Sequence, residues 1–216
     1  MGLFYFPCNF VYWKKIQNHE KFKKELLQLF ENKSEYFKQH PLIGNGNSTY
    51  YSKNCSDFII KQYNEMVDSV VWEPIDELIK TLNERENFEK IKINKSVILN
   101  CWSSKYEENA VVSCHNHASD ISQPHHFING ESYKSTFSLI YILNDDNERN
   151  HTEFLEPSMC GNNVSTNVET RFKTCDVEEI REGTVLIFPS NLYHQVNPIP
   201  KSGRIIMSFN IVSTFN

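Results

Sequence analysis

Two short apolar runs near the end of the sequence, joined by a loop with a histidine, constrain the fold more than any other feature. The first run covers residues 184–188 between Gly183 and Pro189, and the loop after it contains His194. The second run begins at Arg204 and is rich in strand-forming residues. Two such runs with a short connection predict neighbouring strands that carry the histidine at one end.

The second run places a cation among buried positions. Side chains alternate between the two faces of a strand, so one face is expected to present Arg204, Ile206, Ser208 and Asn210. A buried guanidinium is costly unless it is paired, and its planar fork suits a carboxylate. Two partners remain open at this point: a bound organic acid, or an Asp or Glu of the chain itself if the arginine lies at the rim of the sheet.

A second group of histidines follows an earlier strand-like segment. Residues 110–114 have strand character, and His115 and His117 stand two positions apart at its end, so both rings are expected to point to one side. Together with His194 they would provide three imidazoles, a donor set suited to iron, zinc, copper or nickel.

A carboxylate is the alternative third ligand. Asp120 or Glu131 follows the two histidines and would complete a set of two histidines and one carboxylate. His125 and His126 lie in a polar segment and are interpreted as surface or hydrogen-bonded residues and not as ligands. The sequence therefore leaves the third ligand open between an imidazole and a carboxylate.

Four segments carry a resemblance to a known family. They resemble the 2-oxoglutarate and iron(II)-dependent oxygenase superfamily, and most closely its group of uncharacterised bacterial and phage members. The most specific segment fixes about a dozen positions, and the resemblance covers roughly residues 91–216. The segments are N-C-W at 100–102, H-N-H at 115–117, SLIYILN at 138–144 followed by FLEP at 154–157, and G-x4-F-P-S-x3-H-x-V-x-P with R-x3-S-F-N over 183–210.

The resemblance implies both a cofactor set and residue roles. Iron(II) and 2-oxoglutarate would be the cofactors, with His194 as the distal iron ligand and His115 and His117 at the proximal position. Arg204 would anchor the far carboxylate of 2-oxoglutarate. As in similar enzymes, two further side chains would hydrogen-bond that carboxylate, namely Ser208 and Tyr141.

One departure from the family pattern affects the metal ligands. Superfamily members usually have His-x-Asp or His-x-Glu at the proximal position, whereas this chain has His117 in the second slot. If His115 and His117 both bind, the site is similar to that of cupin-type thiol dioxygenases, which do not use 2-oxoglutarate. Asp120 would instead restore the usual carboxylate.

The chain is expected to form a single domain over residues 1–216. Residues 1–90 are predicted to be mostly helical, with apolar residues at helical spacing in 18–32 and 57–82, the latter interrupted at Pro74. The predicted fold is mainly β, a double-stranded β-helix (jelly-roll or cupin-like) core backed by helices. The strands are expected near residues 93–102, 110–117, 136–144, 152–155, 184–188 and 204–212.

The composition of the chain bears on its binding partners and on its cellular compartment. The net charge of −5, from 27 acidic and 22 basic residues, argues mildly against nucleic acid as an obligate partner. No segment is apolar enough for a membrane span. Six cysteines without paired spacing and no leader-like start predict a cytoplasmic protein with reduced thiols, in the host cytoplasm if a phage or virus encodes it.

Three functions are compatible with these observations. The first is an Fe(II)- and 2-oxoglutarate-dependent dioxygenase that hydroxylates a small molecule or a protein side chain and releases succinate and CO2. The second is a three-histidine iron dioxygenase that does not use 2-oxoglutarate. The third is a non-catalytic jelly-roll module with incidental histidines.

Overall fold

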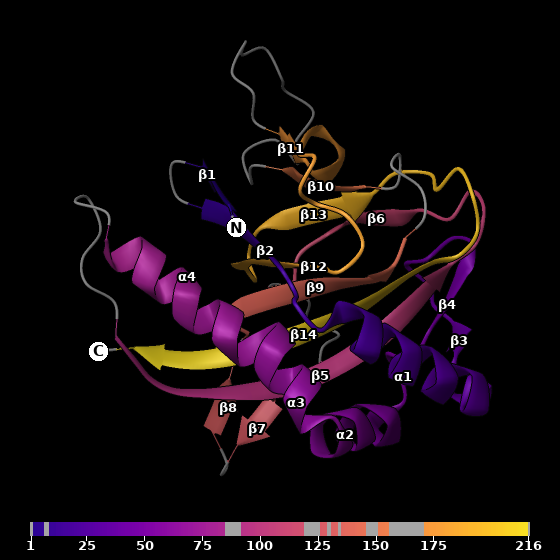
Figure 1. Ribbon diagram of the computed structural model, residues 1–216, viewed down its shortest axis with the longest axis horizontal. Coiled ribbons are helices and arrows are strands. Elements are labelled where there is room, and N and C mark those ends of the chain that lie inside the picture. The colour runs from indigo at the N-terminus through magenta and orange to yellow at the C-terminus, as the bar shows by residue number, and fades with distance from the viewer. Residues whose placement is uncertain are drawn as a thin grey trace.

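Two antiparallel sheets face each other, and helices pack on the outer side of the larger sheet (Figure 1). The computed structural model describes residues 2–6, 9–84, 92–118, 126–128, 131–133, 135–145, 151–155 and 171–215. Within these ranges, none of the helices combines the length and the hydrophobicity needed to span a bilayer.

The larger sheet has eight strands, and its centre comes from the apolar runs of the sequence. The strands are β1 (Gly2–Phe6), β2 (Asn9–Lys15), β3 (Lys38–Gln39), β4 (Gly46–Ser48), β5 (Ile93–Tyr106), β9 (Phe137–Asn144), β12 (Thr184–Pro189) and β14 (Arg204–Phe215). Their order across the sheet is β1-β2-β12-β9-β14-β5-β4-β3. The first seven residues of β9 are all buried, because both faces of this central strand are covered.

The smaller sheet has four strands in the order β11-β10-β13-β6. They are β6 (Val112–His115), β10 (Thr152–Leu155), β11 (Arg171–Lys173) and β13 (Tyr193–Val196). A separate hairpin of β7 (His126–Ile128) and β8 (Glu131–Tyr133) extends away from both sheets (Figure 1). The two facing sheets form the predicted double-stranded β-helix, so the fold class is confirmed.

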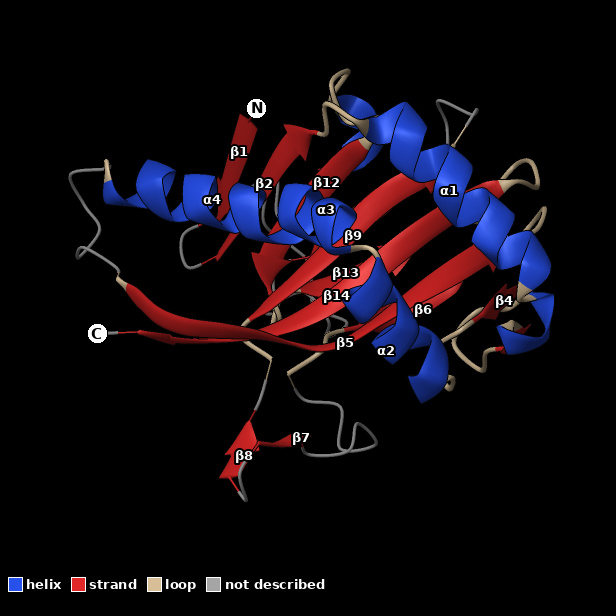
Figure 2. Cartoon of the chain, turned by 60° about the horizontal axis from the view of Figure 1, so that its bottom comes forward, coloured by secondary structure: helices blue, strands red, loops and turns tan. Residues whose placement is uncertain are grey.

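Helices cover one face of the larger sheet (Figure 2). Helix α1 turns a stripe of apolar residues with helical spacing toward the sheet, including Phe22, Leu26 and Phe30. Pro74 stands in the first turn of α4, where a missing amide hydrogen costs no bond. The helices are α1 (His19–Asn32), α2 (Lys53–Gln62), α3 (Asn64–Val67), a π-helical turn (Asp68–Trp72) and α4 (Glu73–Asn83), with short 3-10 turns at Ser34–Tyr36 and Thr174–Asp176.

The larger sheet separates two apolar cores. On its helical side, alternate residues of β9 such as Leu139 and Leu143 pack with the helices. The intervening residues Ile140 and Ile142 point the other way, between the two sheets, where they join Phe154 of β10. The second core therefore lies between the two sheets, next to any site that they enclose.

The helix predictions are close to the observed elements, whereas four N-terminal strands were not predicted. The expected helix over 18–32 is observed as α1, and Pro74 lies in the first turn of α4 as expected. The break in the segment 57–82 lies at Tyr63 and not at Pro74, because α3, the π-helical turn and α4 follow one another without interruption. Strands β1 to β4 escape sequence analysis because β3 and β4 have only two and three residues, too few for a periodic pattern. Strand β2 is buried on both faces in its first half and shows no alternation.

The helical core allows a direct test of the sheet's packing. Phe209 of β14 is fully buried on the helical side, so Phe209→Ala should lower the free energy of unfolding by about 3–5 kcal/mol. Phe58→Ala is the matched control, because Phe58 is 43% exposed and should cost far less. Chemical denaturation measures both, and equal losses would contradict this assignment of the core.

Candidate metal and cosubstrate site

Two strands of the smaller sheet bring three histidines together. Strand β13 pairs with β6 in a register that sets His194 opposite His115. His117 follows β6 and is fixed by a 2.7 Å hydrogen bond from its backbone amide to the carbonyl oxygen of Ser190. The ring centroids lie 4.3 Å apart for His115 and His194 and 5.1 Å apart for His117 and His194. One ligand nitrogen from each ring lies within 4.8 Å of the others.

Each of the three rings is held through the same nitrogen. The partner of every Nδ1 is a carbonyl or amide oxygen, which can only accept a hydrogen bond, so Nδ1 carries the proton and Nε2 carries the lone pair. Histidines that bind metals are oriented in this way. The contacts are His115 to Ser113 O at 2.8 Å, His117 to Asn210 Oδ1 at 2.7 Å and His194 to Leu192 O at 3.1 Å.

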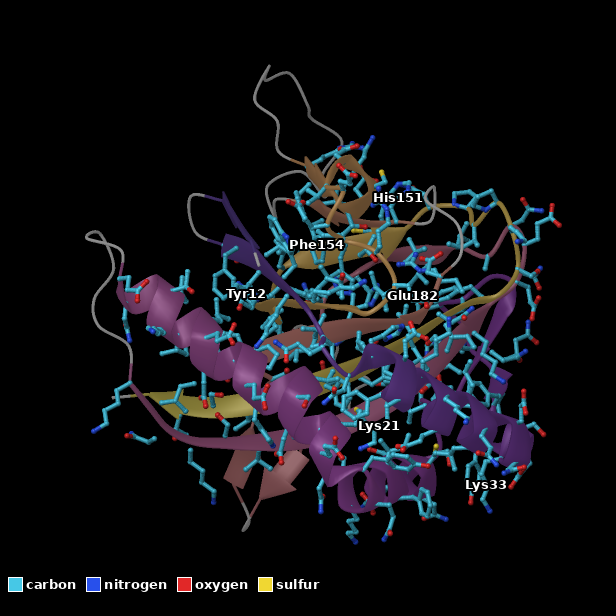
Figure 3. All side chains as sticks on the ribbon, in the orientation of Figure 1. Tyr12, Lys21, Lys33, His151, Phe154 and Glu182 are labelled. Carbon is cyan, nitrogen blue, oxygen red and sulfur yellow. The ribbon has the colours of Figure 1, made fainter. Side chains whose placement is uncertain are left out.

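The environment keeps His194 neutral. Burial lowers its pKa well below the usual 6.5, and the neighbouring His115 and His117 lower it further. Phe188 and Phe154 pack against the ring with centroid distances of 4.9 and 5.9 Å; Phe154 is labelled in Figure 3. A neutral imidazole is the form that binds a metal, so the donor set fits Fe(II) and other first-row divalent ions.

The histidines line a cavity of about 610 Å³ between the two sheets. Aromatic rings lead from its rim to the histidines: Trp102 stacks on His117 at 5.6 Å, and Tyr50 packs edge-on against Trp102 at 5.2 Å. Two of the few exposed large apolar side chains, Leu42 and Tyr51, lie at the rim. None of the described lining residues is an Asp, Glu, Lys or Arg.

Arg204 is buried next to this cavity, behind the Tyr106 ring, and is not itself one of the lining residues. It is 1% exposed, and its guanidinium carbon lies 5.7 Å from the centre of the Tyr106 ring, which lines the cavity. Its Nε lies 3.2 Å from Asp145 Oδ2, and its Nη2 donates a long 3.4 Å hydrogen bond to Thr152 Oγ1. Ser208, two alternate positions along β14, is buried and lines the cavity.

The arginine retains unused hydrogen-bonding capacity. Among the described residues, neither Nε nor Nη1 of Arg204 has a hydrogen-bond partner of good geometry. A guanidinium has five N–H donors, and burying them unsatisfied is costly. Both partners left open by the sequence are thus compatible with the structure: Asp145 is the chain's own carboxylate, and the remaining donors suit a second one.

The structure does not bring Tyr141 to this site. Its side chain lies in the helical core, where its hydroxyl group forms a 2.7 Å hydrogen bond with Nδ1 of His19. Its predicted contact with the cosubstrate is therefore wrong. Strand β9 is apolar on both faces, so the sequence held no signal of which face was inward, and Ile140 and Ile142 are the residues that face the second core.

The alternative carboxylate ligand is not among the described residues. Asp120 and His125 lie outside them, and so do the side chains of His126 and Glu131. The choice between a third imidazole and a carboxylate remains a prediction, although three imidazoles already converge without Asp120.

Several residues of the site were not predicted from the sequence. The roles of Tyr106 and Asp145 depend on the register of β5 and on the end of β9, neither of which leaves a pattern in the sequence. Asn210 was assigned to the correct face, but its contact with His117 could not be foreseen. Its Oδ1 also accepts a 2.9 Å hydrogen bond from the hydroxyl group of Ser138.

Asn210 provides a test of the orientation of His117. Asn210→Ala removes the acceptor for Nδ1, so the ring loses its fixed tautomer, and metal affinity should fall by about 10- to 100-fold. Anaerobic titration with Fe(II), or with Co(II) as a spectroscopic substitute, measures this loss. Asn47→Ala on β4 is the control, because Asn47 is exposed. Unchanged metal affinity in Asn210→Ala would remove His117 from the ligand set.

Comparison with solved structures finds similar folds. The structures described below are each below 20% identical to this chain, so the likeness concerns the fold alone. A prolyl-4-hydroxylase from Pseudomonas putida matches with 11% identity and a TM-score of 0.51, over 93% of this chain and 91% of that one. HygX from Streptomyces hygroscopicus, with nickel and 2-oxoglutarate bound, matches with 16% identity and a TM-score of 0.54, over 94% and 83%.

A third similar structure is the viral collagen prolyl hydroxylase from Paramecium Bursaria Chlorella virus-1 in complex with 2-oxoglutarate. It has 16% identity and a TM-score of 0.51, over 93% of this chain and 95% of that one. A search of curated proteins finds no match.

The sequence itself matches a family model described as a 2OG-Fe(II) oxygenase. The match covers residues 100–210, which is more than half of the 216-residue chain, and it includes the three histidines and Arg204. Family membership favours the first of the three functions considered from the sequence. The chain belongs to the 2OG-Fe(II) oxygenase family and is a 2-oxoglutarate-dependent Fe(II) oxygenase, with iron and 2-oxoglutarate as its cofactors.

Proposed function

We propose that His115, His117 and His194 bind Fe(II), that Arg204 binds the far carboxylate of 2-oxoglutarate, and that the enzyme hydroxylates an organic substrate and releases succinate and CO2. The observation that carries this proposal is the convergence of three imidazoles, each protonated on Nδ1, in one cavity. Bound iron and 2-oxoglutarate supply the oxidising chemistry, and the protein positions the reactants.

The number of protein ligands fits this reaction. Three ligands leave positions at the metal for a chelating keto acid and for dioxygen. With His117 in place of the usual carboxylate, all three protein ligands would be neutral imidazoles, which would not offset the charge of a divalent ion that attracts the anionic keto acid. The hydrogen bonds at Nδ1 hold the three rings in place before the metal arrives.

Arg204 and Ser208 form the expected contact surface for the cosubstrate. The guanidinium has donors without partners among the described residues, and it is shielded from water, which strengthens a charge-assisted bond. Ser208 lies four residues along the same strand and supplies a hydroxyl group in the cavity. A dicarboxylic keto acid bound between the histidines and Arg204 would be fixed at both ends.

The outer part of the cavity suits an uncharged substrate group. Its described lining contains the rings of His40, Tyr50, Tyr51 and Trp102. Histidines are the only titratable residues in this lining that could carry a positive charge, and no Asp, Glu, Lys or Arg is among the described lining residues. Proteins of similar fold have been crystallised with different molecules bound: HygX with hygromycin B, and a Trichoplax adhaerens prolyl hydroxylase with a peptide fragment. These observations support a small molecule or a protein side chain as the substrate.

Arg204 provides the test of the cosubstrate site. Arg204→Gln removes the charge, so the affinity for 2-oxoglutarate should fall by about 10- to 100-fold, as expected for a lost charge-assisted bond. Anaerobic calorimetry on Fe(II)-loaded protein measures this, and succinate formation measures turnover. Arg171→Gln is the control, because Arg171 is largely exposed and pairs with Glu153. Retained affinity for 2-oxoglutarate in Arg204→Gln would contradict the proposed anchor.

A pair of variants tests the metal ligands. His117→Ala should abolish stoichiometric Fe(II) binding, because one of the three donors is lost, whereas Asp120→Asn should retain it. Metal content after anaerobic reconstitution gives both results. The opposite outcome, with iron lost in Asp120→Asn and kept in His117→Ala, would identify the carboxylate as the third ligand.

A further inference from the structure

The guanidinium of Arg204 already has a counter-ion within the protein. We propose that Asp145 is this counter-ion, that it competes electrostatically with the far carboxylate of 2-oxoglutarate, and that it thereby sets the affinity and selectivity of the enzyme for dicarboxylic keto acids. The inference rests on the proposed role of Arg204 as the anchor.

The two charged groups form a buried pair. The side chain of Arg204 is 1% exposed and that of Asp145 is 7% exposed, with 3.2 Å between Nε and Oδ2. A buried guanidinium without a nearby negative charge would strongly destabilise the fold. Asp145 therefore allows Arg204 to remain buried beside the cavity when no cosubstrate is bound.

The pair is held by charge more than by hydrogen-bond geometry. Nε of Arg204 lies close to Asp145 but has no well-aligned hydrogen bond among the described residues, and Nη1 has none either. The bond from Nη2 to Thr152 is long at 3.4 Å. The guanidinium is thus neutralised while most of its donors stay available, so a second carboxylate can bind beside Asp145.

Glu182 links the backbone of Asp145 to helix α1. Its backbone amide donates a 2.8 Å hydrogen bond to Oε2 of Glu182, which is labelled in Figure 3. The other oxygen of Glu182 contacts Lys23 Nζ at 2.6 Å and His19 Nε2 at 3.2 Å, both on α1. Burial raises the pKa of Glu182, but these bonds outweigh burial and hold the pKa below its usual value. A charged Glu182 thus keeps the backbone of Asp145 in place.

This arrangement has a consequence for binding. When the far carboxylate of 2-oxoglutarate reaches Arg204, two carboxylates share one buried cation, and their repulsion lowers the affinity. A 2-oxo acid without a second carboxylate does not experience this repulsion. Asp145 therefore reduces the preference for 2-oxoglutarate over monocarboxylic keto acids.

Asp145→Asn isolates the charge, because asparagine has nearly the same shape and keeps an oxygen acceptor for Nε. The variant should bind 2-oxoglutarate about tenfold more tightly than the wild type, since the cosubstrate becomes the main counter-ion of Arg204. Its affinity for 2-oxopentanoate, which has the same chain length but no second carboxylate, should not change. Anaerobic calorimetry on Fe(II)-loaded protein measures both dissociation constants.

Controls separate a charge effect from a structural one. Glu77→Gln removes another part-buried carboxylate, bonded to Tyr12 and Lys14, and should change neither dissociation constant. If Asp145→Asn does not fold, Asp145→Ser is measured instead, because it is also neutral. A parallel rise in affinity for 2-oxopentanoate would show a general rearrangement of the cavity and would overturn the proposal.

The outcomes also distinguish this inference from the function on which it rests. If Arg204→Gln loses affinity for 2-oxoglutarate but neutral variants at Asp145 bind it equally or more weakly than the wild type, only the counter-ion role is overturned. If Arg204→Gln keeps the affinity of the wild type, the anchor role and the counter-ion role both fail.

Discussion

The antiparallel pairing of β6 with β13 is the contact on which the rest of the site depends. Its register sets His115 opposite His194, and the chain that leaves β6 carries His117 to the same side. A shift by one residue would turn the side chains of either strand to the opposite face of the sheet. The smaller sheet therefore positions the three histidines, and the larger sheet forms the wall behind them, from which Asn210 contacts His117.

Burial affects the histidines and Arg204 differently, because an imidazole can lose its proton and a guanidinium cannot. The three histidines are packed against one another, and burial together with the neighbouring His115 and His117 lowers the pKa of His194. Arg204 cannot avoid its charge in the same way, because a guanidinium does not deprotonate in proteins. It needs a carboxylate, and Asp145 meets that need within the chain. The proposed competition between Asp145 and the far carboxylate of 2-oxoglutarate follows from this need of a buried arginine for a negative partner.

Much of this arrangement was predictable from local patterns. The alternation in β14 assigned Arg204, Ser208 and Asn210 to one face, and the spacing around His115 and His117 predicted a shared direction. Tyr141 was misplaced because β9 is apolar on both faces, so its sequence carries no period-two signal. No sequence pattern predicted the short strands β3 and β4. The same is true of the contact between Asp145 and Arg204.

The sequence by itself determined the family, the double-sheet core and the residue types of the site, because strand alternation and motif spacing are local properties of the chain. Tertiary structure alone decided which face of β9 lies inward, which carboxylate pairs with Arg204 and which aromatic rings line the cavity. These features depend on the register between strands distant in sequence and on the burial of both faces of the larger sheet. Short-range periodicity contains no information about either.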